Sequence, residues 1–174
     1  NMLGKIDEII DNTVKIKLEI DITQQPNLVN LHVIFEDGTD KKIVAEVANV
    51  NKEFLYANVV GEINGDFFMP GASKKPSFKS TVRLIQEAEL SLLLGERETK
   101  FGYTNFGTSN VYDGYKINVP INDFFNTHFC ILGNSGAGKS CTVASIFQKL
   151  YTSSPTPPIN SALIFFDAYG EYTN

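Results

Sequence analysis

Residues 133–140 constrain the fold of this chain more than any other segment, because they form a glycine-rich loop of fixed spacing. The loop has the sequence Gly-Asn-Ser-Gly-Ala-Gly-Lys-Ser and matches the GxxxxGK[S/T] phosphate-binding motif at every fixed position. The apolar run 129–132 before it predicts a buried parallel strand. After the loop, apolar residues recur with helical spacing at Val143, Ile146, Phe147 and Leu150. Strand, loop and helix in this order predict a phosphate-loop unit rather than an ordinary glycine turn.

The residue types of the loop suit a bound nucleoside triphosphate. Glycines can adopt positive φ and let backbone N–H groups approach an anion, and the N-terminus of the following helix adds about half a positive charge. We expect Lys139 to contact the β- and γ-phosphates as a catalytic residue and Ser140 to bind Mg²⁺. The expected nucleotide-binding residues are Gly133, Asn134, Ser135, Gly136, Ala137, Gly138, Lys139, Ser140 and Cys141.

Composition narrows the classes of protein that this chain can belong to. Its 174 residues are 43% hydrophobic, which suffices for one good core or two small ones. The net charge of −5 argues against a protein that coats nucleic acid through a generally basic surface, although a local patch stays open. No apolar run approaches the length of a transmembrane helix, and Cys130 and Cys141 lack the CxxC spacing. We therefore expect a cytoplasmic protein with two reduced cysteines and no membrane contact.

The N-terminal part of the chain predicts a small closed β-barrel over residues 1–79. Four short segments are rich in β-forming residues and are separated by close turns, which include the hairpin signal Asp37-Gly38. These segments are 13–20, 31–35, 42–50 and 54–60. Closure of a barrel would remove exposed strand edges.

The rest of the chain is expected to change from a linker to an α/β core. Residues 80–110 predict a linker, with a helix from about Thr81 to Leu94 and a loop after it. Residues 111–174 predict a lead-in strand at 115–120, the phosphate-loop unit and a second buried strand at 162–166. A complete phosphate-loop ATPase core needs further parallel strands and a later acidic residue. We therefore expect this chain to be the N-terminal part of a larger protein.

The phosphate loop and its surroundings resemble a known family. The run 127–143 resembles the start of the ATPase core in HerA-type proteins of the HerA–FtsK superfamily. Residues 167–172, Asp-Ala-Tyr-Gly-Glu-Tyr, resemble the signature that follows the second core strand of that family, which often has proline where this chain has Ala168. The expected barrel, with its closing segment 65–71, is similar to the small barrel that precedes the core in these ATPases.

The resemblance implies a fold, cofactors and partners. The fold would be α/β plus β, a small N-terminal β-barrel followed by the start of a RecA-like P-loop NTPase core. ATP and Mg²⁺ would be the cofactors of a homo-hexameric translocase or helicase on double-stranded DNA. Such proteins work with a nuclease or with an anti-phage defence effector, and their barrel supports ring assembly and partner docking. The family's Walker B residues, sensor and arginine finger have no counterpart here, so this fragment is expected to bind nucleotide better than it hydrolyses it.

Two carboxylates, Asp167 and Glu171, follow the strand expected at 162–166, at the end where open α/β sheets bind ligands. Mainly from the resemblance, we expect Asp167 to bind Mg²⁺ and Glu171 to act as a catalytic residue that orients water. A capping or surface role at the strand end is the alternative.

The segment starting at Asp167 also fits the DxxG motif of GTPases. The spacing disfavours a GTPase, because between Lys139 and Asp167 there is room only for one helix, a proline-rich turn and a strand.

Other noticeable residues have ordinary structural interpretations. His32 and His128 lack partner ligands at metal-binding spacing and are expected to be packed or at the surface. A modest basic cluster could contact DNA, although a solvated linker is the favoured interpretation; its members are Lys74, Lys75, Lys79 and Arg83. Core packing is expected for the paired phenylalanines Phe67, Phe68, Phe124, Phe125, Phe165 and Phe166.

Two functions of other classes stay open. One is a different barrel-plus-core ATPase that acts on protein or protons rather than DNA, which the segment 167–172 disfavours. The other is a non-catalytic scaffold, in which nucleotide locks a ring and the barrel recruits a partner enzyme.

Overall fold

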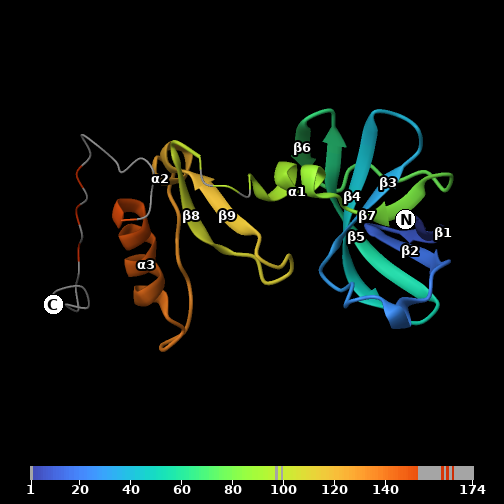
Figure 1. Cartoon of the computed structure of the whole chain (residues 1–174), viewed down its shortest axis with the longest axis horizontal. Coiled ribbons are helices and arrows are strands. Elements are labelled where there is room, and N and C mark those ends of the chain that lie inside the picture. Colours follow the sequence, from blue (N-terminus) through green and yellow to red (C-terminus); the bar gives the residue numbers. More distant parts are fainter. Residues whose placement is uncertain are drawn as a thin grey trace. The chain divides into compact units, whose positions relative to one another are not determined.

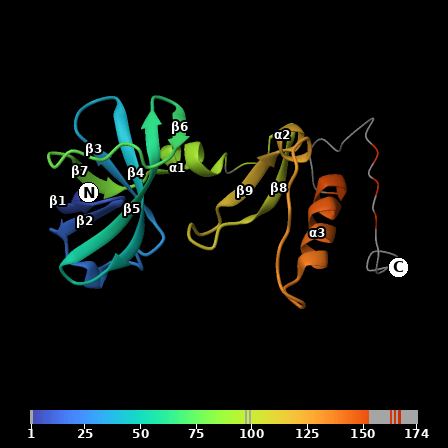
Figure 2. The same ribbon diagram turned by 180° about the vertical axis from the view of Figure 1, so that it is seen from behind.

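The computed structural model describes residues 2–96, 98, 100–152, 162, 164 and 166. The chain divides into two compact units, Asn1–Leu93 and Leu94–Asn174. The first unit contains most of the strands, and the second contains a strand pair and two helices (Figures 1 and 2). Among the described residues, no helix is long and apolar enough to cross a membrane.

Six strands of the first unit close into the expected barrel, so this part of the fold prediction is confirmed (Figure 1). They are β1 (Met2–Ile10), β2 (Thr13–Leu18), β3 (His32–Glu36), β4 (Lys41–Val50), β5 (Phe54–Asn64) and β7 (Thr81–Leu84). The order β2-β1-β7-β3-β4-β5 is closed by the pairing of β2 with β5, and all neighbours are antiparallel. The additional strand β6 (Phe67–Pro70) pairs with the end of β5. A short 3-10 helix, η1 (Ile22–Gln24), follows β2.

The barrel interior is filled by apolar side chains that alternate along the strands. In β2, Val14 and Ile16 are fully buried while their neighbours are not, as the period of a strand requires. The strands β1 and β2 approach closely at Gly4, where an added Cβ would lie 2.0 Å from the carbonyl oxygen of Lys17. A second cluster, formed by Ile34, Val44 and Ile63, packs against partly buried residues that include Leu92 and Leu93.

The predicted start of the helix at Thr81 is wrong. Residues Thr81–Leu84 form strand β7, and the helix α1 (Glu87–Leu94) begins six residues later than expected. The strand pairs with β1 on one side and β3 on the other, and Val82 is fully buried in the barrel core. These tertiary contacts outweigh the local capping signal. The assignment of residues 80–110 to a linker in the complete protein stays a prediction.

The second unit is built on an antiparallel pair, β8 (Tyr103–Thr108) and β9 (Lys116–Pro120), with helices α2 (Ile121–Phe125) and α3 (Lys139–Thr152). Strand β9 confirms the lead-in strand, and α3 confirms the expected helix, with Ile146 and Leu150 buried on its apolar face. The prediction of a loop over 95–110 is wrong in the second half of this range, because β8 forms there by pairing with β9.

The two core strands expected on either side of α3 are not formed by the described residues. The segment 129–132 is in no strand, and its Phe129 and Leu132 are 46% and 87% exposed. A parallel strand needs hydrogen-bonded neighbours, and none of the described residues pairs with this segment. Of the strand expected at 162–166, residues 163 and 165 lie outside the described residues, while Ile164 and Phe166 are exposed.

A network of charged side chains fixes α1 to the barrel. The Nη1 and Nη2 atoms of Arg83 in β7 donate to the Oε2 and Oε1 atoms of Glu89 in α1 at 2.8 and 2.6 Å. Lys42 of β4 donates to Glu89 Oε1 at 2.8 Å, and Arg83 also contacts Glu36 of β3. Burial favours protonation of Glu89, but hydrogen bonds from Arg83 and Lys42 outweigh this effect and lower its pKa to about 2.

Replacing Glu89 should destabilise the first unit strongly. The Glu89→Gln substitution leaves Arg83 and Lys42 without their shared carboxylate, so the free energy of unfolding should fall by about 3 kcal/mol. Urea unfolding at neutral pH measures this change. The matched control is Glu19→Gln, which breaks an exposed ion pair with Lys5 and should cost less than about 1 kcal/mol.

The same pair of variants tests the low pKa of Glu89. Because its folded pKa is lowered to about 2 from an ordinary 4.5, its stabilisation is fully present above about pH 4.5 and is lost as the pH falls towards 2. The Glu89→Gln protein should therefore lose less stability over this range than the unmodified chain. Equal destabilisation by Glu89→Gln and Glu19→Gln, or equal acid sensitivity, would contradict the role assigned to the network.

Candidate nucleotide-binding site

The glycine loop leads directly into α3. Gly136 and Gly138 adopt φ values of +79° and +82°, which side chains other than glycine rarely take. The helix begins at Lys139, and the backbone N–H of Thr142 donates to the carbonyl oxygen of Gly138 at 2.8 Å. The loop glycines therefore bring the chain sharply into the first turn of a helix of 14 residues.

The loop curls so that its two ends approach each other. A Cβ added at Gly133 would lie 3.1 Å from the Cβ atom of Ala137, and the N–H of Ala137 donates to the carbonyl oxygen of Asn134 at 3.1 Å. The Nζ atom of Lys139 donates to that same carbonyl oxygen at 2.9 Å. The ammonium group of the motif lysine is thus held against the first half of the loop.

The geometry of the loop fits a phosphate group. A Cβ added at Gly136 or Gly138 would meet nothing within 4 Å, so there is open space beside the loop at both positions. Residues 133–137 are exposed, while Lys139 and Ser140 are half-buried at the start of α3. The loop thus combines an accessible backbone, a helix N-terminus and a lysine, which together attract anions.

A cluster of five phenylalanines packs around the two flanks of the loop. Phe124 of α2 lies with its ring centroid 5.0 Å from that of Phe129, four residues before Gly133. Phe125 of α2 lies 6.0 Å from Phe147 of α3, beyond the loop. Phe106 of β8 completes the cluster at 5.1 Å from Phe124. The short helix α2 therefore contacts both the segment that enters the loop and the helix that leaves it.

A hydrogen bond adds to this anchoring. The Nζ atom of Lys149 in α3 donates to the carbonyl oxygen of Phe106 in β8 at 3.3 Å. Phe124 and Phe125 pack against other rings but are only half-buried, so the expected core packing is confirmed in part, and the participation of Phe106 and Phe129 was not predicted. The apolar residues that flank the loop in the sequence were the available signal for this cluster. Phe106 comes close to Phe124 only through the pairing of β8 with β9.

Several other candidate residues lie at exposed positions or outside the described structure. Asp167 and Glu171 lie outside the described residues. Among the described residues, no group of three or more histidine, cysteine or acidic side chains could hold a metal ion. Cys130 and Cys141 are free thiols at exposed positions, and His128 is exposed as expected.

The basic cluster of the first unit is largely used inside that unit. Lys74 donates to Glu62 at 2.7 Å, and Lys75 donates to the carbonyl oxygen of Ala72 at 2.8 Å and also contacts Asn12. Arg83 belongs to the network around Glu89. These contacts disfavour a DNA-binding surface made by the whole cluster. Phe67 is exposed, so the core packing expected for it is wrong.

Comparison with known protein families finds a match within the second unit. Residues 105–174 match the family model described as the central domain of helicase HerA. This match supports the predicted resemblance to a HerA-like ATPase fragment. The matched range contains the glycine loop, α3 and the segment 167–172, and it excludes the barrel. No curated protein matches the chain.

Truncation of Phe125 should loosen α3 next to the loop. The Phe125→Ala substitution removes ring contacts to α3 and to Phe129, and should cost about 2 kcal/mol because Phe125 is half-buried. Hydrogen exchange of backbone amides in α3 should then be faster by roughly 30-fold. The control is Phe101→Ala in the same unit, which removes a side chain that is 81% exposed. Equal protection of α3 in both variants would show that the cluster does not anchor the loop.

Proposed function

We propose that the loop 133–140 binds Mg·ATP in a HerA-like ATPase. The observation that carries this proposal is a phosphate-binding motif with positive-φ glycines at the start of α3, inside the range that matches the HerA central domain. The loop amides and the helix N-terminus would receive the β-phosphate. The ammonium of Lys139 would move from the carbonyl oxygen of Asn134 to the β- and γ-phosphates.

The remaining roles follow from the positions of the loop residues. The hydroxyl of Ser140 would help to hold Mg²⁺, whose charge would offset that of the phosphates. Backbone groups or contacts around the phosphates would come from the other loop residues, Asn134, Ser135, Ala137 and Cys141. Fixed donors of this kind stabilise charge that develops during phosphoryl transfer, without reorganising in the reaction.

We assign Asp167 to the Mg²⁺ shell and Glu171 to the orientation of the attacking water, on the strength of the sequence resemblance. Both residues belong to the range matched by the HerA family model. Their carboxylates suit the task, because carboxylate oxygens bind Mg²⁺ and can accept a proton from water.

At the level of the full-length protein, we propose an ATP-driven translocase or helicase on double-stranded DNA. The protein would act as a homo-hexamer in the cytoplasm, beside a nuclease or a defence effector. The name of the matched family supports the helicase class, and the closed barrel offers a separate compact unit for assembly.

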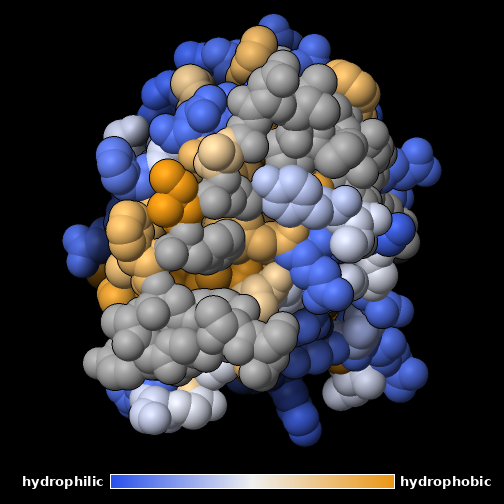
Figure 3. All heavy atoms as spheres, turned by 90° about the vertical axis from the view of Figure 1, so that its left-hand side faces the viewer, coloured by the Kyte–Doolittle hydropathy of each residue, from blue (hydrophilic) through white to orange (hydrophobic). Residues whose placement is uncertain are grey.

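An exposed apolar surface supports the proposal that further core strands complete the second unit. Phe129, Leu132 and Tyr151 are exposed large apolar residues of this unit. Figure 3 shows apolar side chains gathered on the face turned to the viewer. Where exposed apolar side chains gather on one face, they commonly mark contact with a partner or with another part of the chain. In the proposed RecA-like core, neighbouring strands would cover it.

DNA-dependent turnover tests the proposed function. ATP hydrolysis by the full-length protein should rise several-fold when linear double-stranded DNA is added, because translocation couples the two. The Lys139→Ala variant should lose at least about 100-fold in turnover, since it removes the cation that neutralises the transferred phosphoryl group. A steady-state assay of phosphate release with and without DNA measures both effects.

The matched control is Lys100→Ala, which removes an exposed lysine of the same unit that pairs with Glu96. This variant should hydrolyse ATP at the rate of the unmodified protein. Turnover that does not respond to DNA would contradict the translocase and favour a motor that acts on protein. Nucleotide binding without any turnover would favour a nucleotide-locked scaffold.

A further inference from the structure

The strand β6 forms an open edge of the sheet in the first unit. It pairs with β5 on one side, and none of the described residues pairs with its other side in a sheet. Both ribbon views show β6 beside β5 at the border of the sheet (Figures 1 and 2). An edge of this kind presents backbone N–H and C=O groups to which a further strand can bind.

The hydrogen-bond pattern shows which backbone groups of β6 point outwards. The N–H of Gly71, directly after the strand, donates to the carbonyl oxygen of Val60 at 2.9 Å. Opposite residues of an antiparallel pair alternate between bonded and non-bonded, so the N–H and C=O groups of Phe68 point away from β5. Pro70 faces the same way but has no N–H. Phe68 is therefore the residue of β6 that offers both a donor and an acceptor at the open edge.

The side chains of β6 divide between the two faces of the sheet. Phe68 packs against the second core cluster, and a Cβ added at Gly61 would clash with its ring. Phe67 and Met69 lie on the opposite face and are 75% and 42% exposed. Phe68 thus fixes the strand to the first unit, while an exposed apolar side chain lies on each side of its outward backbone groups.

These features are complementary to a second copy of the same strand. When two copies of β6 pair antiparallel about a twofold axis at Phe68, each Phe68 N–H donates to the C=O group of the other. The same register places Phe67 of each copy opposite Met69 of the other. A thioether beside an aromatic ring is a favourable contact, so the backbone and the side chains select the same register.

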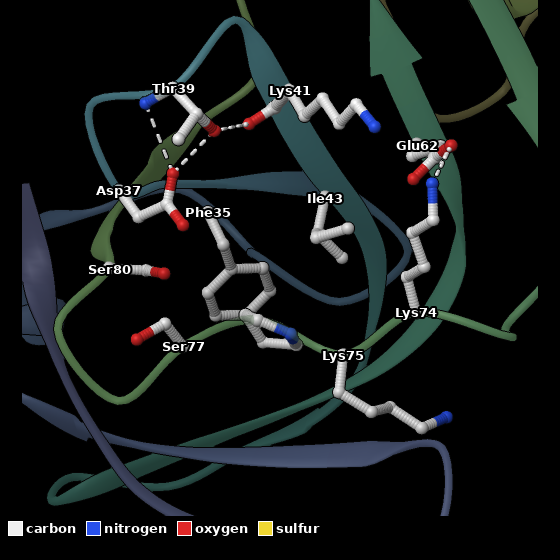
Figure 4. A pocket seen from close by; sticks show the side chains of 11 residues that line it. Phe35, Asp37, Thr39, Lys41, Ile43, Glu62, Lys74, Lys75, Ser77 and Ser80 are labelled. Carbon is white, nitrogen blue, oxygen red and sulfur yellow. Dashed lines mark hydrogen bonds and ion pairs between the residues drawn. The ribbon is translucent and has the colours of Figure 1, made fainter.

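Charge does not oppose this contact. The strand β6 contains no charged residue, although charged side chains commonly protect open edges. Glu62 of β5 lies opposite Met69, but its carboxylate is bonded to Lys74 at 2.7 Å (Figure 4). Asp66, in the turn before β6, comes opposite Pro70 of the second copy rather than opposite another acid.

We propose that the β6 edges of two copies of this chain pair to form a symmetric dimer. Both copies use the same edge, so the contact closes at two copies and does not extend into a fibre. A strand of four residues buries less than a standard interface, so the dissociation constant should be on the order of 0.1 mM. A twofold contact cannot by itself close a ring of six, so this contact is distinct from ring assembly and from the glycine loop.

Hydrogen exchange at Phe68 tests the pairing directly. Its backbone N–H is unbonded in the monomer and bonded in the dimer, so exchange in the full chain should be about fourfold slower at about 1 mM protein than at about 10 μM. Sedimentation equilibrium over the same range should show monomer and dimer. Exchange at Phe68 that does not change with protein concentration would overturn the proposal, even if the chain associates through another surface.

Substitutions test the register. Phe67→Asp should weaken the dimer at least about tenfold, because it places a charge against Met69 of the second copy. Adding Met69→Lys to Phe67→Asp sets opposite charges across the twofold axis and should regain at least about threefold in affinity. The matched control adds Met2→Lys instead, at a methionine of similar exposure (44%), and should regain nothing. Undiminished association of Phe67→Asp, no recovery with Met69→Lys, or equal recovery with Met2→Lys would overturn the pairing.

Discussion

The position of β7 between β1 and β3 holds the first unit together. The strand completes the closed ring and places Val82 in its interior, so that no free edge is left among the six barrel strands. The next residue, Arg83, donates to Glu89 and contacts Glu36, so the same strand fixes α1 to the barrel. Four residues therefore provide both the closure of the sheet and the attachment of its helix.

In the second unit, aromatic packing holds the segments on both sides of the glycine loop. The rings of Phe124 and Phe125 in α2 lie against Phe129 on one side of the glycine loop and Phe147 on the other. The loop is exposed and contains glycines, so it has little packing of its own to fix its shape. Packing at both flanks limits how far the two ends of the loop can separate. In the proposed function, this restraint would lower the entropic cost of binding a phosphate chain.

The features predicted correctly from the sequence are those determined by local pattern. Alternating apolar residues located β2, β4 and β5, and the fixed motif located the loop and α3. The errors concern segments whose state depends on distant partners. Thr81–Leu84 has a capping signal but pairs with two strands, and β8 contains turn-forming residues but pairs with β9. The charge contacts of Glu62 and Glu89 join residues up to 47 positions apart, which no local pattern reveals.

Direct binding of Mg·ATP to this chain tests the central claim most directly. Equilibrium titration with a fluorescent ATP analogue should give an affinity at least tenfold lower for Lys139→Ala, which removes the motif cation, and for Gly138→Ala, which strains a backbone at φ +82°. The matched controls Lys100→Ala and Gly107→Ala should bind like the unmodified chain, since a Cβ at Gly107 meets nothing within 4 Å. Equal affinity in all four variants would contradict the assignment of the loop as the nucleotide site.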